Sequence, residues 1–145
     1  MRLTLAESRL LKDSIGIISE LVSEVNFKID KDKIEIIAVD PANVVMVVFK
    51  LLGSAFIEYD VKKECNIAVS LDSLKQILRR VKPTDTLTLE LDEEKNRLKV
   101  VLKGDSHRTF NLSLIDIEDR EQKVPVLDFP VKGEINSQVL EEAIE

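Results

Sequence analysis

The chain contains an internal repeat, and this repeat restricts its possible folds more than any other feature. Apolar and helix-capping positions near the N-terminus return 64 positions later in the same order. The corresponding pairs are Leu3 and Ile67, Leu5 and Val69, Ser8 and Asp72, and Leu10 and Leu74. A repeated pattern indicates a supersecondary unit that buries its apolar face against a copy of itself. We therefore expect one domain, residues 1–117, built from two units at about residues 1–64 and 65–117.

The first unit is predicted to form a strand, a helix and three further strands. Leu3 and Leu5 alternate with polar residues, which is typical of a strand. Apolar residues then recur at helical spacing; they are Leu10, Leu11, Ile15, Ile18, Leu21 and Val22. Ser8 is placed to cap this helix, because its hydroxyl can accept an otherwise unpaired backbone N–H. Three strands are predicted next: residues 25–29 and 34–38 alternate with period two, and residues 44–49, VVMVVF, form a short apolar strand.

The second unit begins near Asn66 and repeats this order. Asp72 takes the capping position, and a helical stripe follows; its members are Leu74, Ile77, Leu78 and Val81. Three alternating segments come next, TLTLEL, RLKVVL and FNLSLI, of which the first two are joined by the turn DEEKN. Both units therefore predict a βαβββ order.

A third unit is predicted at the C-terminal end. Residues 137–144 match residues 8–15 at an offset of 129, with Ser137, Val139, Leu140 and Ile144 in the positions of Ser8, Leu10, Leu11 and Ile15. This helix would have an apolar face with nothing of its own to pack against, so we expect the chain to be part of a longer repeat protein. Residues 118–130, polar and with Pro125 and Pro130, are predicted to form an extended connector, and residues 131–145 to begin a second domain.

Composition excludes several classes of function. The 145 residues are 44% apolar and 33% charged, as in a globular domain. No segment approaches the roughly 20 apolar residues of a membrane helix, and the N-terminus lacks the basic flank and apolar run of a secretory signal. We expect an intracellular protein that is cytoplasmic, associated with the nucleoid if archaeal and nuclear if eukaryotic.

The sequence offers no constellation for catalysis. Cys65 and His107 are single residues of their kinds, so neither a disulfide within the chain nor a Cys/His zinc cluster is expected. Nothing places a nucleophile beside His107, which is predicted to be an exposed turn residue. The acidic cluster DEEK at residues 92–95 lacks the alternating ligands of a calcium loop and is predicted to form a solvated turn. We expect no enzyme activity, no metal and no cofactor.

Positive charge is concentrated on the second predicted helix, although the net charge is -6. The segment 71–83 holds one acidic residue, Asp72, and four basic residues: Lys75, Arg79, Arg80 and Lys82. Lys75 and Arg79 are four residues apart and share the face opposite the apolar stripe. On the first helix, Arg9 and Lys12 repeat this arrangement more weakly. Such a face is either plain solvated surface or a contact for a polyanion, and its presence on two related helices favours the second interpretation.

The basic residues are not interleaved with aromatic ones, which argues against the base stacking of single-strand binders. Contact with backbone phosphates alone is expected. Such contact holds duplex DNA without reading its sequence, and it weakens as the salt concentration rises.

Several segments together resemble the PCNA (proliferating cell nuclear antigen) family of DNA sliding clamps, most closely its archaeal members. They are EVNFKIDKDKIEIIAVDPANVVMVVF, LDSLKQILRRVKPTDTLTLEL, RTFNLSLIDIED and the connector EQKVPVLDF, and the resemblance covers the whole chain. The pair Asp40 and Pro41, the nearby Val44, and the segment that ends at Ile115 and Asp116 are the most specific signals.

The resemblance implies an α+β DNA clamp fold, in which two βαβββ repeats place two helices on one side and antiparallel sheets on the other. It also implies that three subunits form a toroidal ring around duplex DNA. This trimeric ring would serve as a DNA polymerase processivity factor in DNA replication and DNA repair. The basic residues that would face DNA are Arg9, Lys12, Lys75, Arg79, Arg80 and Lys82. Ser19 and Gln76 stand where relatives often have a basic residue, which weakens the contact expected of the first helix.

The resemblance further implies a pocket for a short peptide plug from partner proteins, namely DNA polymerase, clamp loader, flap endonuclease and DNA ligase. Its walls would be Val39, Asn43, Val44 and Met46, with Val124, Pro125, Val126, Leu127 and Phe129 of the connector. The alternative is that Val44 and Met46 are ordinary strand core, but an apolar run in a polar connector favours an exposed binding patch. The resemblance also implies that an edge strand of this domain forms the interface with the next subunit. The residues that match this strand are Thr109, Phe110, Asn111, Leu112, Ser113 and Leu114.

Three hypotheses follow. The first is a ring-forming processivity factor, made of identical or of related chains. The second is a clamp-like checkpoint or regulatory subunit that keeps the fold and the partner pocket. The third is a small enzyme or ligand-binding α+β domain with an accidental resemblance, and the lack of an active site counts against it.

Overall fold

The computed structural model describes residues 1–116 and 123–145. Its helices and strands are, in chain order, β1 (Arg2–Leu5), α1 (Arg9–Ile18), β2 (Glu24–Ile29), β3 (Lys33–Val39), β4 (Met46–Leu52), the short 3-10 helix η1 (Gly53–Ala55), β5 (Glu58–Asp60), β6 (Cys65–Ser70), α2 (Leu71–Leu78), β7 (Thr86–Asp92), β8 (Arg97–Lys103), β9 (His107–Ser113) and α3 (Ser137–Ile144).

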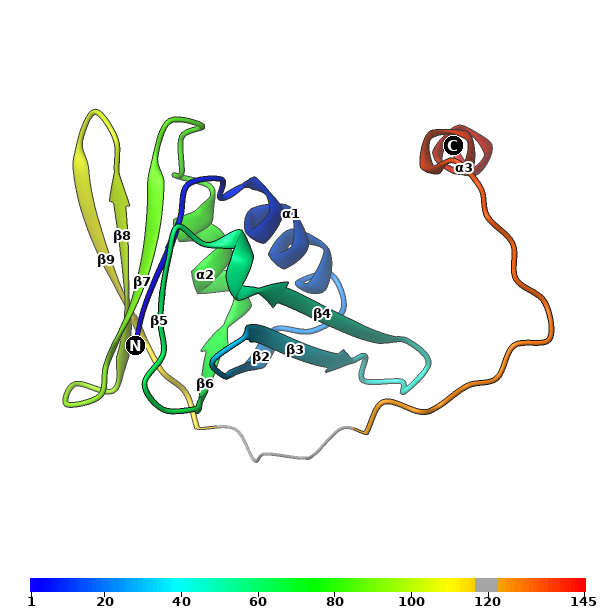
Figure 1. Cartoon of the computed structure of the whole chain (residues 1–145), viewed down its shortest axis with the longest axis horizontal. Coiled ribbons are helices and arrows are strands. Elements are labelled where there is room, and N and C mark those ends of the chain that lie inside the picture. The colour runs from blue at the N-terminus through cyan, green and yellow to red at the C-terminus, as the bar shows by residue number, and fades with distance from the viewer. Residues whose placement is uncertain (117–122) are drawn as a thin grey trace.

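The strands form two antiparallel sheets, and each sheet takes strands from both repeats (Figure 1). One sheet has the order β5-β1-β7-β8-β9 and the other β4-β3-β2-β6. The first strand of each repeat thus pairs with the other repeat: Leu3 lies opposite Leu89, and Phe27 lies opposite Ile67. Helices α1 and α2 lie next to each other against the sheets. The predicted α+β fold with two βαβββ repeats is confirmed.

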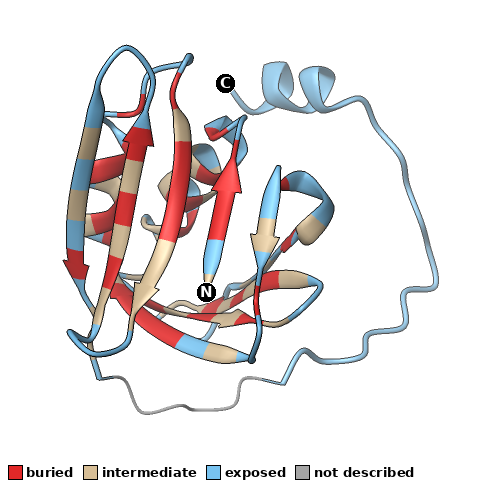
Figure 2. Cartoon of the chain, turned by 60° about the vertical axis from the view of Figure 1, so that its left-hand side comes forward, coloured by how far each residue is buried: buried red, intermediate tan, exposed pale blue. Residues whose placement is uncertain are grey.

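The core lies between the sheets and the helices. Every second residue of β3 is buried, as expected for a strand with one face against the core (Figure 2). On α1 the buried residues are Leu11, Ile15 and Ile18, one face of a helix. Each fully buried leucine or isoleucine contributes about 1.5–3 kcal/mol relative to an exposed one. The apolar periods of the sequence therefore act mainly through this shared core.

The helix caps differ from the predicted ones. Ser8 is the N-cap residue of α1, but its φ and ψ of -87° and -8° are helical and its side chain forms no capping hydrogen bond. A capping side chain reaches the first turn from an extended backbone, so Ser8 cannot serve; instead, Glu7 Oε1 accepts a hydrogen bond from Arg9 N at 3.1 Å. Ser70, which is extended, caps α2 through Ser73 N. Asp72, predicted to be the cap, lies in the first turn.

The repeat also has a different register in its helices. Leu10 is 56% exposed, whereas Leu74, its predicted equivalent, is buried. The buried positions of the two helices correspond at an offset of 63: Ser8 and Leu71, Leu11 and Leu74, Ile15 and Leu78, Ile18 and Val81. The first strands of the two repeats keep the offset of 64, because Leu3 and Leu5 are buried like Ile67 and Val69. The helices differ because β6 runs directly into α2, whereas residues 6–8 separate β1 from α1.

Strand β5 was not predicted. It has only three residues, EYD, without an alternating apolar pattern, and it exists because it pairs with β1. Tyr59 anchors it by donating a hydrogen bond to the Asp30 backbone oxygen at 2.8 Å. Strand β4 begins at Met46 rather than at residue 44, and β9 begins at His107 and ends at Ser113, earlier than the predicted FNLSLI.

The C-terminal part contains the predicted helix. Asn136 caps α3 by accepting a hydrogen bond from Gln138 N at 2.9 Å, so Ser137 is the first helical residue. Val139 and Ile144 are 53% and 76% exposed, and Figure 1 shows α3 apart from the two sheets. Residues 123–136, which include the described part of the predicted connector, form neither helix nor strand. The predicted boundary between residues 117 and 118 lies outside the described residues, and the division into domains stays a prediction.

Candidate functional site

The first candidate site is the outer face of α1 and α2. Lys75 and Arg79 are one turn apart on α2, and Lys12 approaches from α1. With Gly16, Ile17 and Leu78 among the other lining residues, they border a shallow groove of about 480 Å³ between the helices. At the N-terminal end of α1, Lys12 also borders a second groove of about 440 Å³ together with Arg9 and Lys82. The helix pair therefore brings five of the six predicted cations onto adjoining surfaces.

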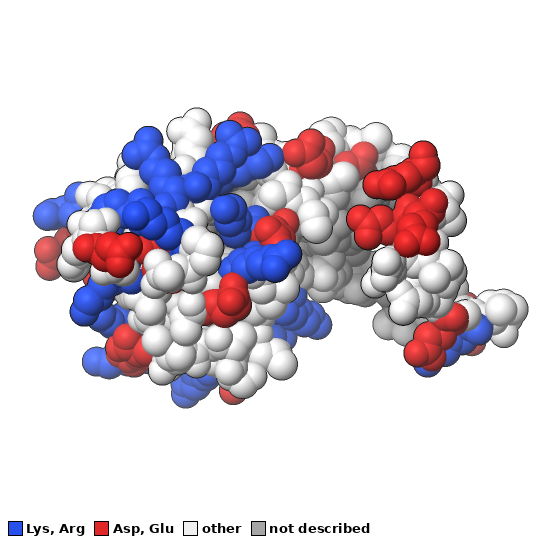
Figure 3. Space-filling view, turned by 90° about the horizontal axis from the view of Figure 1, so that it is seen from above, with Lys and Arg blue, Asp and Glu red and all other residues white. Residues whose placement is uncertain are grey.

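Some of these charges are already paired. Arg9 Nε lies 3.4 Å from Asp13 Oδ2, and Lys75 Nζ lies 3.2 Å from Glu20 Oε1 and donates to Ser19 Oγ at 2.8 Å. Among residues 1–116 and 123–145, Lys12, Arg79 and Lys82 form no ion pair. Lys12, Arg79 and Lys82 are thus the cations of this surface that have no described carboxylate within ion-pair distance, while the exposed pairs of Arg9 and Lys75 are weak and can open. Figure 3 shows Lys and Arg side chains gathered over part of this surface, with single acidic side chains between them.

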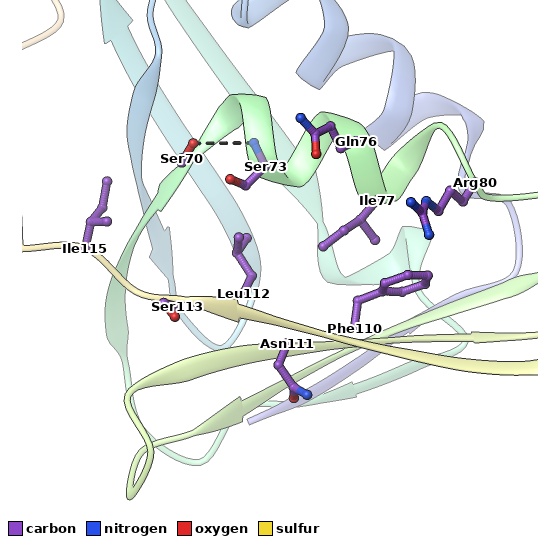
Figure 4. A pocket seen from close by; sticks show the side chains of 10 residues that line it. All are labelled: Ser70, Ser73, Gln76, Ile77, Arg80, Phe110, Asn111, Leu112, Ser113 and Ile115. Atoms are coloured by element: carbon purple, nitrogen blue, oxygen red, sulfur yellow. Dashed lines mark hydrogen bonds between the residues drawn. The ribbon is translucent and has the colours of Figure 1, made fainter.

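Arg80 does not join this surface. Arg80 directly follows Arg79, and consecutive residues of a helix point about 100° apart, so Arg80 turns away from the face of Lys75 and Arg79. Its guanidinium carbon lies 5.5 Å from the centroid of the Phe110 ring on β9. Both residues line a groove of about 520 Å³ between α2 and β9, which also includes Ile77 and Leu112 (Figure 4). The structure thus separates Arg80 from Lys75 and Arg79, which the sequence grouped together.

Two residues in this region were not predicted. Asp85, of which 1% is exposed, accepts a hydrogen bond from Lys82 N at 2.8 Å and pairs with Arg108 Nη2. Arg108 Nη1 also donates to the Arg80 backbone oxygen at 2.9 Å. The pair therefore ties the end of α2 to the start of β9. No pattern in the turn sequence KPTD distinguishes Asp85 from a solvated aspartate.

The predicted interface residues lie on or next to β9, which is an edge strand. In the described part of the chain β9 pairs with β8 alone. Thr109, Asn111 and Ser113 are exposed, while Phe110 and Leu112 line the groove against α2. Leu114 lies just beyond the strand, and its N–H donates to the Asn96 backbone oxygen at 3.0 Å. An unpaired edge of this kind can accept a strand from another chain.

The predicted partner pocket has one wall in the β3–β4 hairpin. Val39 ends β3 opposite Met46, and residues 40–45 form the loop between them. In this loop, Asn43 has a positive φ of 56° and Val44 is 80% exposed. The alternative that Val44 is strand core is therefore wrong. Met46, although it begins β4, is also exposed, at 36%.

The other predicted wall is the connector, and the structure does not bring the two walls together. Val124, Val126, Leu127 and Phe129 are 49%, 102%, 62% and 71% exposed, and Pro125 is exposed as well. Side chains this open do not pack against Val44. The pocket stays a prediction, with its hairpin wall formed and its connector residues available.

The described residues contain no candidate metal cluster. No group of three or more His, Cys, Asp or Glu residues there could hold a metal ion. His107 is exposed at the first position of β9. Within the same residues, none of the helices has the length and apolar character needed to cross a membrane.

The chain is similar to known proteins along its whole length. The family model for "Proliferating cell nuclear antigen, N-terminal domain" matches residues 1–122. A "DNA polymerase sliding clamp" from Nanoarchaeum equitans is 33% identical over 146 residues, covering 100% of this chain and 59% of that protein. Another from Pyrococcus furiosus is 40% identical over 126 residues, covering 87% of this chain and 50% of that protein. The chain thus spans about half the length of the curated relatives it matches.

Solved structures agree with this. A crystal structure of PCNA from Thermococcus kodakaraensis superposes with a TM-score of 0.82 at 30% identity, covering 87% of this chain and 51% of that one. A chain of the PCNA2-PCNA3 complex from Sulfolobus tokodaii superposes with a TM-score of 0.84 at 28% identity, covering 90% and 52%.

Proposed function

The chain belongs to the proliferating cell nuclear antigen family, and on that premise we propose that it supplies part of a ring-shaped DNA sliding clamp. In this function the protein encircles duplex DNA and tethers DNA polymerase and other replication and repair proteins, without chemistry of its own. The observation that carries the proposal is the pair of adjoining helices whose outer faces bring Lys12, Lys75 and Arg79 together over a buried core.

The contact with DNA is made to phosphates. Lysine and arginine side chains on α1 and α2 attract the DNA backbone, whereas the groove that they border contains no aromatic side chain for base stacking. Contacts of this kind position a protein on DNA without reading its sequence. They suit a protein that moves along the duplex, and retention on DNA then comes from ring closure rather than from tight binding.

Ring closure uses the β9 edge and the adjacent groove. A strand of the neighbouring subunit pairs with β9, and apolar side chains cover Phe110 and Leu112 in the α2–β9 groove. Pairing of related clamp subunits has a precedent in the PCNA2-PCNA3 complex of Sulfolobus tokodaii. Three subunits would close the ring, as the family resemblance implies.

Partner proteins bind at the β3–β4 hairpin and the connector. Val44 and Met46 on the hairpin, with Leu127 and Phe129 on the connector, offer exposed apolar side chains to a peptide plug. The plug would draw the connector onto the hairpin, since apolar surface on both sides leaves water on binding. DNA polymerase, clamp loader, flap endonuclease and DNA ligase are the proposed partners.

The DNA contact is tested by removing two cations that form no ion pair. Lys12→Ala with Arg79→Ala, in the protein as its gene encodes it, is expected to shorten the products of primer extension after clamp loading at moderate salt. The slope of log affinity for duplex DNA against log salt should fall by about one for each phosphate that the variant no longer neutralises. A matched control is Lys62→Ala with Lys63→Ala, since both lysines are exposed, lie between β5 and β6 and line neither groove of the helix pair. Equal product lengths for the two double variants would contradict the assignment.

The partner pocket is tested by a charge at its most exposed hairpin residue. Val44→Asp is expected to weaken binding of a partner's peptide by at least about tenfold, because an unpaired carboxylate would be buried on binding. Isothermal titration calorimetry measures the affinity. Ile57→Asp is the control, because Ile57 is also β-branched and exposed, at 66%, and lies outside the predicted pocket. Unchanged affinity of the Val44→Asp variant would reject the pocket.

A further inference from the structure

The loop between β3 and β4 presents Val44 without support from the core. All of residues 41–46 are exposed, and Val44 and Val45 are 80% and 43% accessible. A loop that buries so little apolar surface gains no packing energy to offset the entropy of ordering its backbone, which costs about 1–2 kcal/mol for each residue. Its conformation must therefore be held by hydrogen bonds within the loop.

A single residue, Asp40, accepts these hydrogen bonds. Its carboxylate accepts from Ala42 N through Oδ2 at 3.1 Å and from Val44 N and Val45 N through Oδ1, each at 2.7 Å. Its backbone oxygen accepts from Asn43 N at 2.9 Å. Every N–H of residues 42–45 thus donates to Asp40, and Pro41 has no N–H to satisfy.

The backbone of Asp40 closes the same loop, because its N–H donates to the Val45 oxygen at 3.1 Å. Asn43 takes a left-handed conformation, with φ of 56°, a region that asparagine tolerates better than most residues. The hydrogen bond from Val45, followed by those from Val44 and Ala42, holds the pKa of the Asp40 carboxyl below its usual value. The carboxylate is therefore charged at neutral pH, the form that accepts all three hydrogen bonds.

We propose that Asp40 is the positioning residue of the partner-peptide pocket: without being a wall of the pocket, it fixes the loop so that Val44 is presented to the peptide in its binding position. This inference rests on the proposed function of the hairpin and adds the residue that sets its geometry. A preformed loop loses less entropy on binding than a loop that orders only in the complex. Replacement of Asp40 should thus lower affinity even though every apolar side chain of the pocket remains.

The turn at the other end of β3 supplies a matched control. There, Asp30 Oδ1 accepts from Asp32 N at 2.8 Å and from Lys33 N at 2.9 Å. Asp30 and Asp40 therefore hold the two ends of one strand by the same kind of bond. The two sites are separated by the seven residues of β3, or roughly 20 Å at about 3.3 Å per residue. Replacing Asp30 should disturb the turn between β2 and β3 to a similar degree as replacing Asp40 disturbs the loop between β3 and β4, without reaching the pocket.

The experiment compares Asp40→Ala, Asp40→Asn and Asp30→Ala in the protein as its gene encodes it. The probe is a short fluorescein-labelled peptide with aliphatic and aromatic side chains, taken from the clamp-binding region of the replicative DNA polymerase and followed by fluorescence anisotropy. Asp40→Ala is expected to weaken binding by about tenfold, the effect of ordering one or two further side chains on binding. Asp40→Asn keeps one acceptor oxygen and should recover part of the affinity, and Asp30→Ala should bind like the unmodified protein.

A second readout follows the loop itself. Amide hydrogen exchange at Val44 and Val45 should be faster in Asp40→Ala than in Asp30→Ala, because exchange reports local opening. Wild-type affinity of Asp40→Ala, or equal losses in Asp40→Ala and Asp30→Ala, would overturn the inference. If Val44→Asp also binds normally, the pocket itself is rejected; if Val44→Asp fails to bind while Asp40→Ala binds normally, only the positioning role is rejected.

Discussion

Aspartate side chains hold several turns of this molecule by accepting backbone N–H groups. Asp30 and Asp40 do so at the two ends of β3, and the bonds, led by those from Asp32 and Val45 respectively, lower the pKa of each carboxyl. In the unfolded chain these bonds are absent, and the pKa of an aspartate side chain is about 3.9. A carboxyl whose pKa is lower in the folded state contributes stability above the unfolded pKa and loses it as the pH falls through the folded pKa.

This gives a prediction for acid conditions. The melting temperature should decline as the pH falls below about 4, and the decline should be shallower in a variant with Asp30→Asn and Asp40→Asn, since neither amide titrates. Scanning calorimetry over this pH range measures the difference. A control with Asp60→Asn and Asp105→Asn, both exposed, should decline like the unmodified protein. Parallel curves for all three proteins would contradict the role of these hydrogen bonds.

Asp85 is a buried charge, and its removal is expected to be costly. Asp85→Ala leaves the Arg108 guanidinium without its partner, and loss of one member of a buried pair typically costs about 3–5 kcal/mol. Since the Arg108 side chain is 28% exposed, the lower end is expected, about 3 kcal/mol. Urea unfolding gives the value.

The exposed pair of Arg9 and Asp13 supplies the control, and Asp13→Ala should cost under about 0.5 kcal/mol. In a variant with both Asp85→Ala and Arg108→Ala the loss should be smaller than the sum of the single losses. Additive losses would show that the two side chains do not act together.

At the scale of helices and strands, apolar periodicity predicted most elements, because the same period decides which residues reach the core. It could not predict β5, whose three residues are ordered by pairing with β1. It also placed the cap of α2 at Asp72 instead of Ser70, and it predicted a capping hydrogen bond that Ser8 does not form, since a cap depends on backbone angles and not on side-chain type alone. Nor could it predict the shift of the helices to an offset of 63, which comes from the different length of the link between the first strand and the helix in the two repeats.

The corrected helix register can be tested at α1. Leu11 is buried and Leu10 is 56% exposed, although the two are leucines next to each other in the sequence. Leu11→Ala should reduce the free energy of unfolding by about 2–5 kcal/mol, the range for truncation in a core. Leu10→Ala should change it by no more than about 0.5 kcal/mol. Chemical denaturation distinguishes the two, and the reverse order would support the offset of 64.

At the scale of the whole molecule, the structure brings together some of the residues that the sequence grouped and separates others. Lys12, Lys75 and Arg79 meet because they follow the helical period. Arg80 departs because it points about 100° away from its neighbour Arg79, and its position over Phe110 depends on a contact between residues far apart in sequence. Likewise, the exposed loop at Val44 requires the hydrogen bonds of Asp40, which no apolar pattern reveals.

The exchange of first strands between the repeats bears on how such a domain could have originated. Strand β1 completes the sheet of the second repeat and β6 completes that of the first. A polypeptide with one repeat alone would lack a strand in its sheet, and two copies would have to trade first strands to complete both. Gene duplication that joined two such copies would turn a swapped homodimer into a single chain. The exchange of first strands therefore makes each repeat depend on the other for a complete sheet.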